Sequence, residues 1–192
     1  MAIQTFVDGQ VLTAAQMTTL QGNSALTLIS RTTPAAANTL AFDTVFSSTY
    51  SAYFITLENV LISTAGATLL FNVRYGSTTN TDPSWFGSIG GAAYNDNAWI
   101  GVAVGSTTTF LISPGVGSSP GLPSGGVLNV TGVGVSGKYP QVTSTIINGY
   151  QGVMRSGGAT LHSAAQTWTG FILSASAGNI SGTFGIYGMA ST

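Results

Sequence analysis

Short runs of alternating apolar and polar residues constrain what this chain can fold into. From Leu28 onward these runs are rich in β-branched and aromatic residues, and clusters of Gly, Ser, Asn and Pro separate them. A period of two between turn residues is typical of half-buried strands. The predicted strands cover residues 53–62, 69–75, 99–104, 127–130, 167–173 and 183–187. Because no helical segments lie between them, the pattern predicts an all-β fold, an antiparallel sandwich or barrel.

The beginning of the chain has a different pattern. Thr13 and Gln16 have the spacing of a capping box, in which the hydroxyl accepts a backbone N–H three residues on and the amide side chain reaches back. Leu12 and Met17 occupy the two positions of a hydrophobic staple. Since a glycine follows as a stop signal, we expect a short helix over residues 14–21.

This helix cannot be stable alone, because its apolar stripe consists only of Met17 and Leu20. It must dock on the rest of this chain, on a sibling subunit or on another protein. We therefore divide the chain into an N-terminal arm over residues 1–27 and a β-sandwich domain over residues 28–192.

Charged residues make up 5% of the chain, against roughly 25% in ordinary soluble domains. Abundant Ser, Thr, Asn and Gly residues can supply an uncharged but wettable surface. The net charge of −1 offers no basic stripe for phosphates, so we do not expect nucleic-acid binding. The chain has no Cys, and none of its segments supplies the ~18–20 mainly apolar residues of a membrane-spanning helix. We therefore expect no disulfide, no thiolate metal site and no membrane insertion.

Residues 112–126 are the segment richest in proline and glycine. That composition disfavours a regular strand or helix and predicts a long exposed loop. Such a loop is either a contact surface or a simple connector.

The chain is short of catalytic residues. Its one histidine, His162, would have to serve in any Ser-His-Asp triad, and no nucleophile-elbow motif accompanies it. We expect His162 to be a hydrogen-bonded strand or loop residue. The acidic residues available for paired-carboxylate chemistry are Asp8, Asp43, Glu58, Asp82 and Asp96. So few combinations remain that we expect no enzymatic activity, no catalytic residue and no cofactor.

Two further motifs have local explanations. Residues 80–83 and 95–97 are oxygen-rich, but they lack the alternating ligand spacing and closing Glu of a calcium loop, which favours turn chemistry and no metal site. Residues 132–137 match the Gly-x-Gly-x-x-Gly pattern, but the sequence that follows does not open a helix, so the match indicates coincidence.

The aromatic side chains have two alternative roles: they either bind a ligand at the surface or fill the core between the sheets. Trp85 lies between a proline and a glycine, which favours an exposed loop position. Trp85, Tyr94 and Trp99 are the possible ligand contacts, by stacking on sugar rings or by anchoring an interface. Strand alternation would also place Trp168 and Phe171 on opposite faces, leaving one of them at the surface or between subunits.

Three stretches resemble structural proteins of tailed bacteriophages. Residues 5–17, TFVDGQVLTAAQM, are similar to the short arm that precedes the exposed domain of many such proteins. Residues 41–55, AFDTVFSSTYSAYFI, resemble the segment that leads into their first long strand, and residues 178–189, GNISGTFGIYGM, resemble their closing strand. These three stretches occur in the order expected for that family, while the middle third of the chain is unmatched.

The resemblance implies a virion surface protein, assembled in the host cytoplasm, of the tail-fibre or receptor-binding type or of the capsid decoration or head-fibre type. It also implies a homotrimer of jelly-roll-like sandwiches without catalysis. The arm would attach the protein to other virion proteins of the capsid or tail. Its expected docking residues are Phe6, Val7, Val11, Leu12, Met17 and Leu20. The alternative is an arm folded back on its own sandwich.

Two functions compete within this interpretation. A receptor-binding fibre would hold a host glycan or surface protein through its distal loops, whereas a decoration protein would stabilise the capsid lattice. The lack of a long shaft in these 192 residues favours a compact decoration or short-fibre protein. The alternative from another class is a lectin-like, glycan-binding module that uses Trp85 or Trp99.

Overall fold

A computed structural model describes most of the predicted β domain. The described residues are 13, 26–93, 96–119, 121–150, 152–163 and 166–190. The predicted helix over residues 14–21 lies outside this set, as do all six expected docking residues of the arm.

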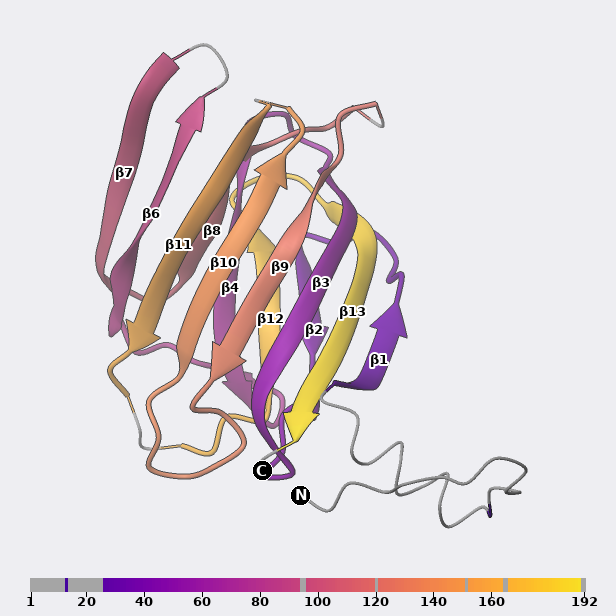
Figure 1. The fold of residues 1–192 in the computed structure, drawn as a ribbon, viewed down its shortest axis with the longest axis vertical. Helices are drawn as coiled ribbons and strands as arrows, with labels where there is room; N and C mark the ends of the chain where they lie inside the picture. Colours follow the sequence, from indigo (N-terminus) through magenta and orange to yellow (C-terminus); the bar gives the residue numbers. More distant parts are fainter. Residues whose placement is uncertain are drawn as a thin grey trace, which may run out of the picture.

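The described chain forms two antiparallel sheets in a sandwich-like arrangement (Figure 1). The larger sheet consists of β1 (Thr27–Thr32), β3 (Tyr50–Ile62), β6 (Trp85–Ala93), β7 (Asp96–Thr107), β9 (Ser124–Thr131), β10 (Gln141–Asn148), β11 (Val153–Leu161) and β13 (Ile180–Ala190). The smaller sheet consists of β2 (Thr39–Phe42), β4 (Ala67–Tyr75), β5 (Thr78–Thr79), β8 (Phe110–Val116) and β12 (Gly170–Ala175). The prediction of an all-β antiparallel fold is confirmed, and no helix occurs among the described residues.

The order of the larger sheet is β1-β13-β3-β9-β10-β11-β6-β7. The smaller sheet runs β2-β12-β4-β5, and β8 pairs with β4 beside β5. Five of the six predicted strand runs lie wholly within observed strands, and the sixth lies partly within β12. Figure 1 looks onto the outer face of the larger sheet, with the smaller sheet behind it.

Alternation along the strands separates the core from the surface. Along β10, residues 142, 144, 146 and 148 are buried and the residues between them are exposed. On β3, Tyr53, Ile55 and Leu57 point into the core in the same way. A period of two gives each strand one inner and one outer row, so the pairing register also fixes which side chains reach the outer face.

Aromatic rings fill the space between the sheets. The Phe171 ring stacks on Phe42 with centroids 4.6 Å apart and lies 5.6 Å from Phe71. These rings come from three neighbouring strands, β12, β2 and β4. Two edge-to-face pairs then bridge the sheets, Phe42 with Phe184 at 5.5 Å and Phe71 with Trp85 at 6.1 Å. The inner faces are therefore held together by one continuous set of rings.

Two expectations about tryptophan exposure are wrong. Trp85 is the first residue of β6 and is fully buried, and its indole Nε1 donates to Asn72 Oδ1 at 3.0 Å. Trp168 and Phe171 are both buried, although alternation was expected to separate them. The reason is that Trp168 precedes β12, so strand alternation does not apply to it.

The expectation of a long exposed loop over residues 112–126 is also wrong for most of its length. Its first part belongs to β8, where Ile112 and Val116 are buried, and its last part opens β9 at Ser124. Strand β8 lies at an edge and pairs only with β4, with two register shifts. Edge strands and bulges are the places in a sheet that tolerate Pro and Gly, so pairing overrides the local composition.

The sandwich has two distinct ends. Strand β1 begins at Thr27, which pairs with Gly188 near the end of β13, so the described chain enters and leaves at one end. We call this the terminal end, and it is the lower end in Figure 1. The connections β3–β4, β8–β9 and β10–β11 lie at the opposite end.

Removing the central ring of the core should be costly. Replacement of Phe171 by Ala should lower the free energy of unfolding by about 3–5 kcal/mol, because it removes a ring that contacts rings from both flanking strands and leaves a cavity. Phe86→Ala is the matched control, since this ring is exposed on β6. Urea denaturation of both variants tests this, and equal losses for Phe171→Ala and Phe86→Ala would contradict the assignment of the core.

Candidate functional site

The outer face of the larger sheet is rich in hydroxyl and amide side chains. Asn129 Nδ2 donates to Thr143 Oγ1 at 3.5 Å, and the hydroxyls of Thr145 and Ser156 lie 3.3 Å apart across β10 and β11. None of the outward-facing residues of β9, β10 and β11 that the structure describes is charged. This face therefore offers neutral hydrogen-bonding groups in rows across the strands.

Apolar side chains gather on this face where the described chain enters and leaves. Leu26 and Leu28 are exposed at the start of β1, and Met189 is exposed near the end of β13. Leu28 pairs with Tyr187, and Tyr187 pairs with Phe54, so these three side chains share the outer face. We call Leu26, Leu28, Phe54, Tyr187 and Met189 the entry patch.

An exposed ion pair borders the entry patch. Arg31 donates to both carboxylate oxygens of Glu58, at 2.8 and 2.6 Å. The hydrogen bonds to Glu58, together with its negative charge, raise the pKa of Arg31. The pair links edge strand β1 to β3 across β13, and its charges neutralise each other.

Three further rings meet across the sheet from the entry patch, also at the terminal end. Phe86 lies on β6, Tyr139 lies in the β9–β10 connection, and His162 directly follows β11. The His162 ring centroid lies 5.1 Å from that of Phe86 and 6.0 Å from that of Tyr139. All three residues are exposed, and we call them the aromatic cluster.

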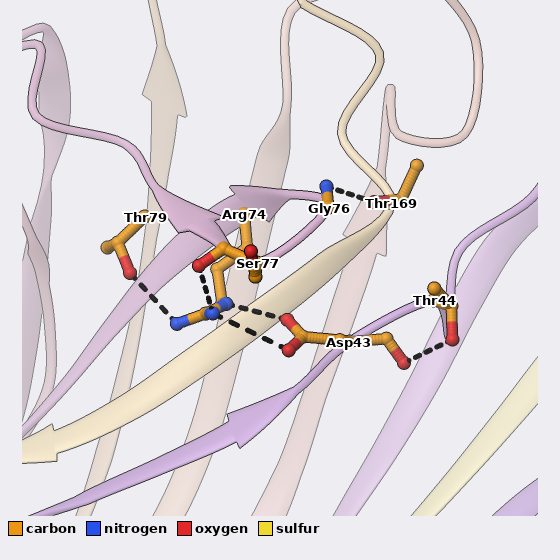
Figure 2. A network of polar contacts seen from close by, with 7 residues as sticks. All are labelled: Asp43, Thr44, Arg74, Gly76, Ser77, Thr79 and Thr169. Carbon is orange, nitrogen blue, oxygen red and sulfur yellow. Dashed lines mark hydrogen bonds and ion pairs between the residues drawn. The ribbon is translucent and has the colours of Figure 1, made fainter.

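A polar network at the terminal end joins the smaller sheet to its neighbouring loops (Figure 2). Arg74 Nε donates to Asp43 Oδ1 at 2.7 Å, Nη1 donates to Thr79 Oγ1 at 3.0 Å, and Nη2 donates to the carbonyl of Ser77. Because these partners hold the guanidinium along its edges, the network fastens the β4–β5 turn to the β2–β3 connection. The Arg74 network therefore has a structural role.

The predicted ligand contacts do not form one site. Trp85 is buried and presents no surface to a ligand. Tyr94 lies outside the described residues, and Trp99 is placed only as a backbone position in β7. The ring that the structure exposes at this position is Phe86, the next residue along β6. Strand alternation starting from Trp85 was the sequence signal that could have found it.

The predicted turn chemistry around Asp82 agrees with the structure. The backbone N–H of Asp82 donates to Asn80 Oδ1 at 3.1 Å, which is a local Asx contact. Residues 132–137 lie in the connection between β9 and β10 and open no helix. His162 is a loop residue whose backbone N–H donates to the carbonyl of Ser84 at 2.9 Å, as expected for a hydrogen-bonded position.

The acidic side chains that the structure describes, those of Asp43, Glu58 and Asp82, are dispersed. Asp43 pairs with Arg74, Glu58 pairs with Arg31, and Asp82 accepts a hydrogen bond from Ser84. Across the described part of the chain, no three His, Cys, Asp or Glu residues gather as a metal site would require. The same residues contain no helix long and apolar enough to cross a membrane.

Comparison of the chain with protein-family models, with curated proteins and with solved structures gives no match.

The two ion pairs should differ in their contribution to stability. Arg74→Met should lower the free energy of unfolding by about 1–3 kcal/mol, because the Arg74 side chain is 11% exposed and the substitution removes its bonds to Asp43, Ser77 and Thr79. Arg31→Met is the control and should cost less, since the Arg31–Glu58 pair is open to water. Denaturant titration measures both, and a larger loss for Arg31→Met would contradict the structural role of the network.

Proposed function

We propose that this chain is a non-enzymatic structural protein on the surface of a tailed-phage virion, attached to the head or tail through its N-terminal arm. The observation that carries the proposal is the entry patch. Exposed apolar side chains surround the point where the arm joins β1, and Met189 lies beside them. The proposed attachment surface therefore combines the apolar residues of the arm with an apolar face on the sandwich.

Burial explains why such a surface would bind. An exposed Leu or Met side chain gains about 1.5–3 kcal/mol when it is fully buried, and the arm and the entry patch together offer several of them. Association retains only part of this gain, because ordering the arm costs entropy. The Arg31–Glu58 pair contributes no net charge at the border of the patch, so the expected partner surface is apolar and uncharged.

The position of the entry patch also suggests an orientation for the displayed domain. Attachment at the terminal end leaves the β3–β4, β8–β9 and β10–β11 connections pointing away from the particle. We further propose that the sandwich is jelly-roll-like and that the protein is a compact decoration or short-fibre protein.

A homotrimer is part of the same proposal. The 44% apolar and 5% charged composition suits a protein that hides part of its surface between subunits, because interface cores are depleted of charge. Sedimentation equilibrium should give three times the 19.5 kDa mass of the chain. A stable monomer at micromolar concentration would remove the trimer from the proposal.

Charges placed on the apolar stripe of the arm should abolish attachment. In the full chain, Met17→Asp with Leu20→Asp should lower association with virions about tenfold or more, because each charge would have to be desolvated at the interface. The matched control is Thr18→Asp with Thr19→Asp, which adds the same two charges on the other side of the predicted helix. Co-sedimentation of labelled protein with virions lacking their own copy measures the association.

The attachment proposal fails if the Met17 and Leu20 variant co-sediments with virions as well as the parent protein does. It also fails if the two doubly charged variants lose association equally, since that result would show a general effect of charge on the arm.

A further inference from the structure

We propose that the aromatic cluster of Phe86, Tyr139 and His162 is a binding site for a neutral saccharide. The rows of neutral hydrogen-bonding side chains on the adjacent outer face of the larger sheet form part of this site. The inference goes beyond the proposed virion role and does not depend on it, because it rests on the described surface and on no residue of the arm. The ligand class is an uncharged oligosaccharide whose sugar rings have apolar faces.

The fold holds each ring of the cluster in place. Phe86 must point outward because Trp85, the residue before it, is anchored in the core by its bond to Asn72. His162 is tied to the segment before β6 by the hydrogen bond from its backbone N–H to Ser84. The site is therefore largely preorganised, which reduces the entropy cost of binding.

The backbone around Tyr139 is closely packed. A Cβ atom on Gly132 would lie 2.0 Å from the carbonyl oxygen of Tyr139, and Gly132 has a φ of +68°. Only glycine allows this close approach between the two ends of the β9–β10 connection. Pro140, the next residue, is buried. The backbone from the Tyr139 carbonyl to Pro140 is thus closely packed, while the Tyr139 side chain remains 54% exposed.

Ring geometry leaves aromatic surface available to a ligand. The Phe86 and His162 rings meet edge to face at 65°, and the His162 and Tyr139 rings are tilted by 38°. Phe86 remains 45% exposed. The C–H groups on one face of a pyranose ring are apolar and slightly positive, so they pack against the negative face of an aromatic ring.

The strand register brings hydrogen-bonding groups next to the rings. Phe86 pairs with Thr160, and Thr160 pairs with Gln141, so hydroxyl and amide groups continue the row that Phe86 begins. In the row two residues further along the strands, Gly158 lies between Ser88 and Thr143. Because Gly158 has no side chain, the sheet surface is bare at this point, and a flat ring can approach the backbone there.

The charge around the cluster favours a neutral ligand. Lys138 precedes Tyr139, and Asp82 lies two residues before Ser84, so the segments that build the cluster bring one charge of each sign. On β6, β11 and β10 the two rows beside it hold Thr160 and Gln141, and Ser88, Gly158 and Thr143, none of which is charged. A neutral sugar can use both the donors and the acceptors of these side chains, whereas an anionic or a cationic ligand would find no net counter-charge.

Binding to the full chain tests the proposal. Maltohexaose, cellohexaose and chitohexaose serve as neutral probes in isothermal titration calorimetry at millimolar concentrations. At least one of them should bind, and Phe86→Ala and Tyr139→Ala should each weaken that binding about tenfold. Tyr150→Ala is the matched control, because Tyr150 is 49% exposed at the opposite end of the sandwich, and it should bind as the parent protein does.

Gly158→Val provides a test that keeps all three rings. Its Cβ atom would lie 3.3 Å from the carbonyl oxygen of Val142 and 3.4 Å from Cγ2 of Thr143, so these neighbours must yield slightly, and the added side chain would stand on the surface that Gly158 leaves bare. Saccharide binding should fall while the thermal transition stays close to that of the parent. Unchanged binding would overturn the placement of the ligand over this row.

The site assignment is overturned if none of the three probes binds, or if Phe86→Ala and Tyr139→Ala bind as tightly as the parent. Association of Phe86→Ala with virions separates this failure from a failure of the attachment proposal, because the arm is intact in this variant. Loss of virion association without saccharide binding would identify the cluster as a protein contact and overturn the saccharide assignment.

Discussion

Stacking of Phe171 between its neighbours on the adjacent strands is the interaction on which the rest of this structure depends. The rings of Phe42, Phe71 and Phe171 form a layer on the smaller sheet, and Phe184 and Trp85 meet that layer from the larger one. Once these rings fix the inner faces, the two-residue period decides which side chains lie outside. The entry patch and the exposed Phe86 ring are both consequences of that choice.

The amino-acid pattern was sufficient to predict the class of fold. Runs such as 53–62 are rich in β-branched and aromatic residues, and this signal depends only on local sequence. Strand β6 is not predicted by the sequence pattern because it is rich in glycine and small residues, so its hydrophobic periodicity is weak. Strand β8 was missed for a related reason, since its Pro and Gly residues signal a loop and only its pairing with β4 makes it a strand.

The candidate sites could be predicted only in part. The apolar residues of the arm are visible in the sequence, but Leu28 and Met189 become neighbouring surface residues only through the pairing of β1 with β13. The aromatic cluster combines residues 86, 139 and 162, which no local pattern connects. The Pro and Gly residues on either side of Trp85 predict an exposed ring, whereas its bond to Asn72 and its contact with Phe71 place it in the core.

The proposed attachment at the terminal end leaves the opposite end of the sandwich free. Site-specific photocrosslinking in assembled virions tests this most directly, with the crosslinking group placed at Met17 of the arm or at Tyr150 in the β10–β11 connection. We expect Met17 to crosslink to another virion protein and Tyr150 to give no such product. Crosslinks from Tyr150 to another virion protein, with none from Met17, would contradict the account.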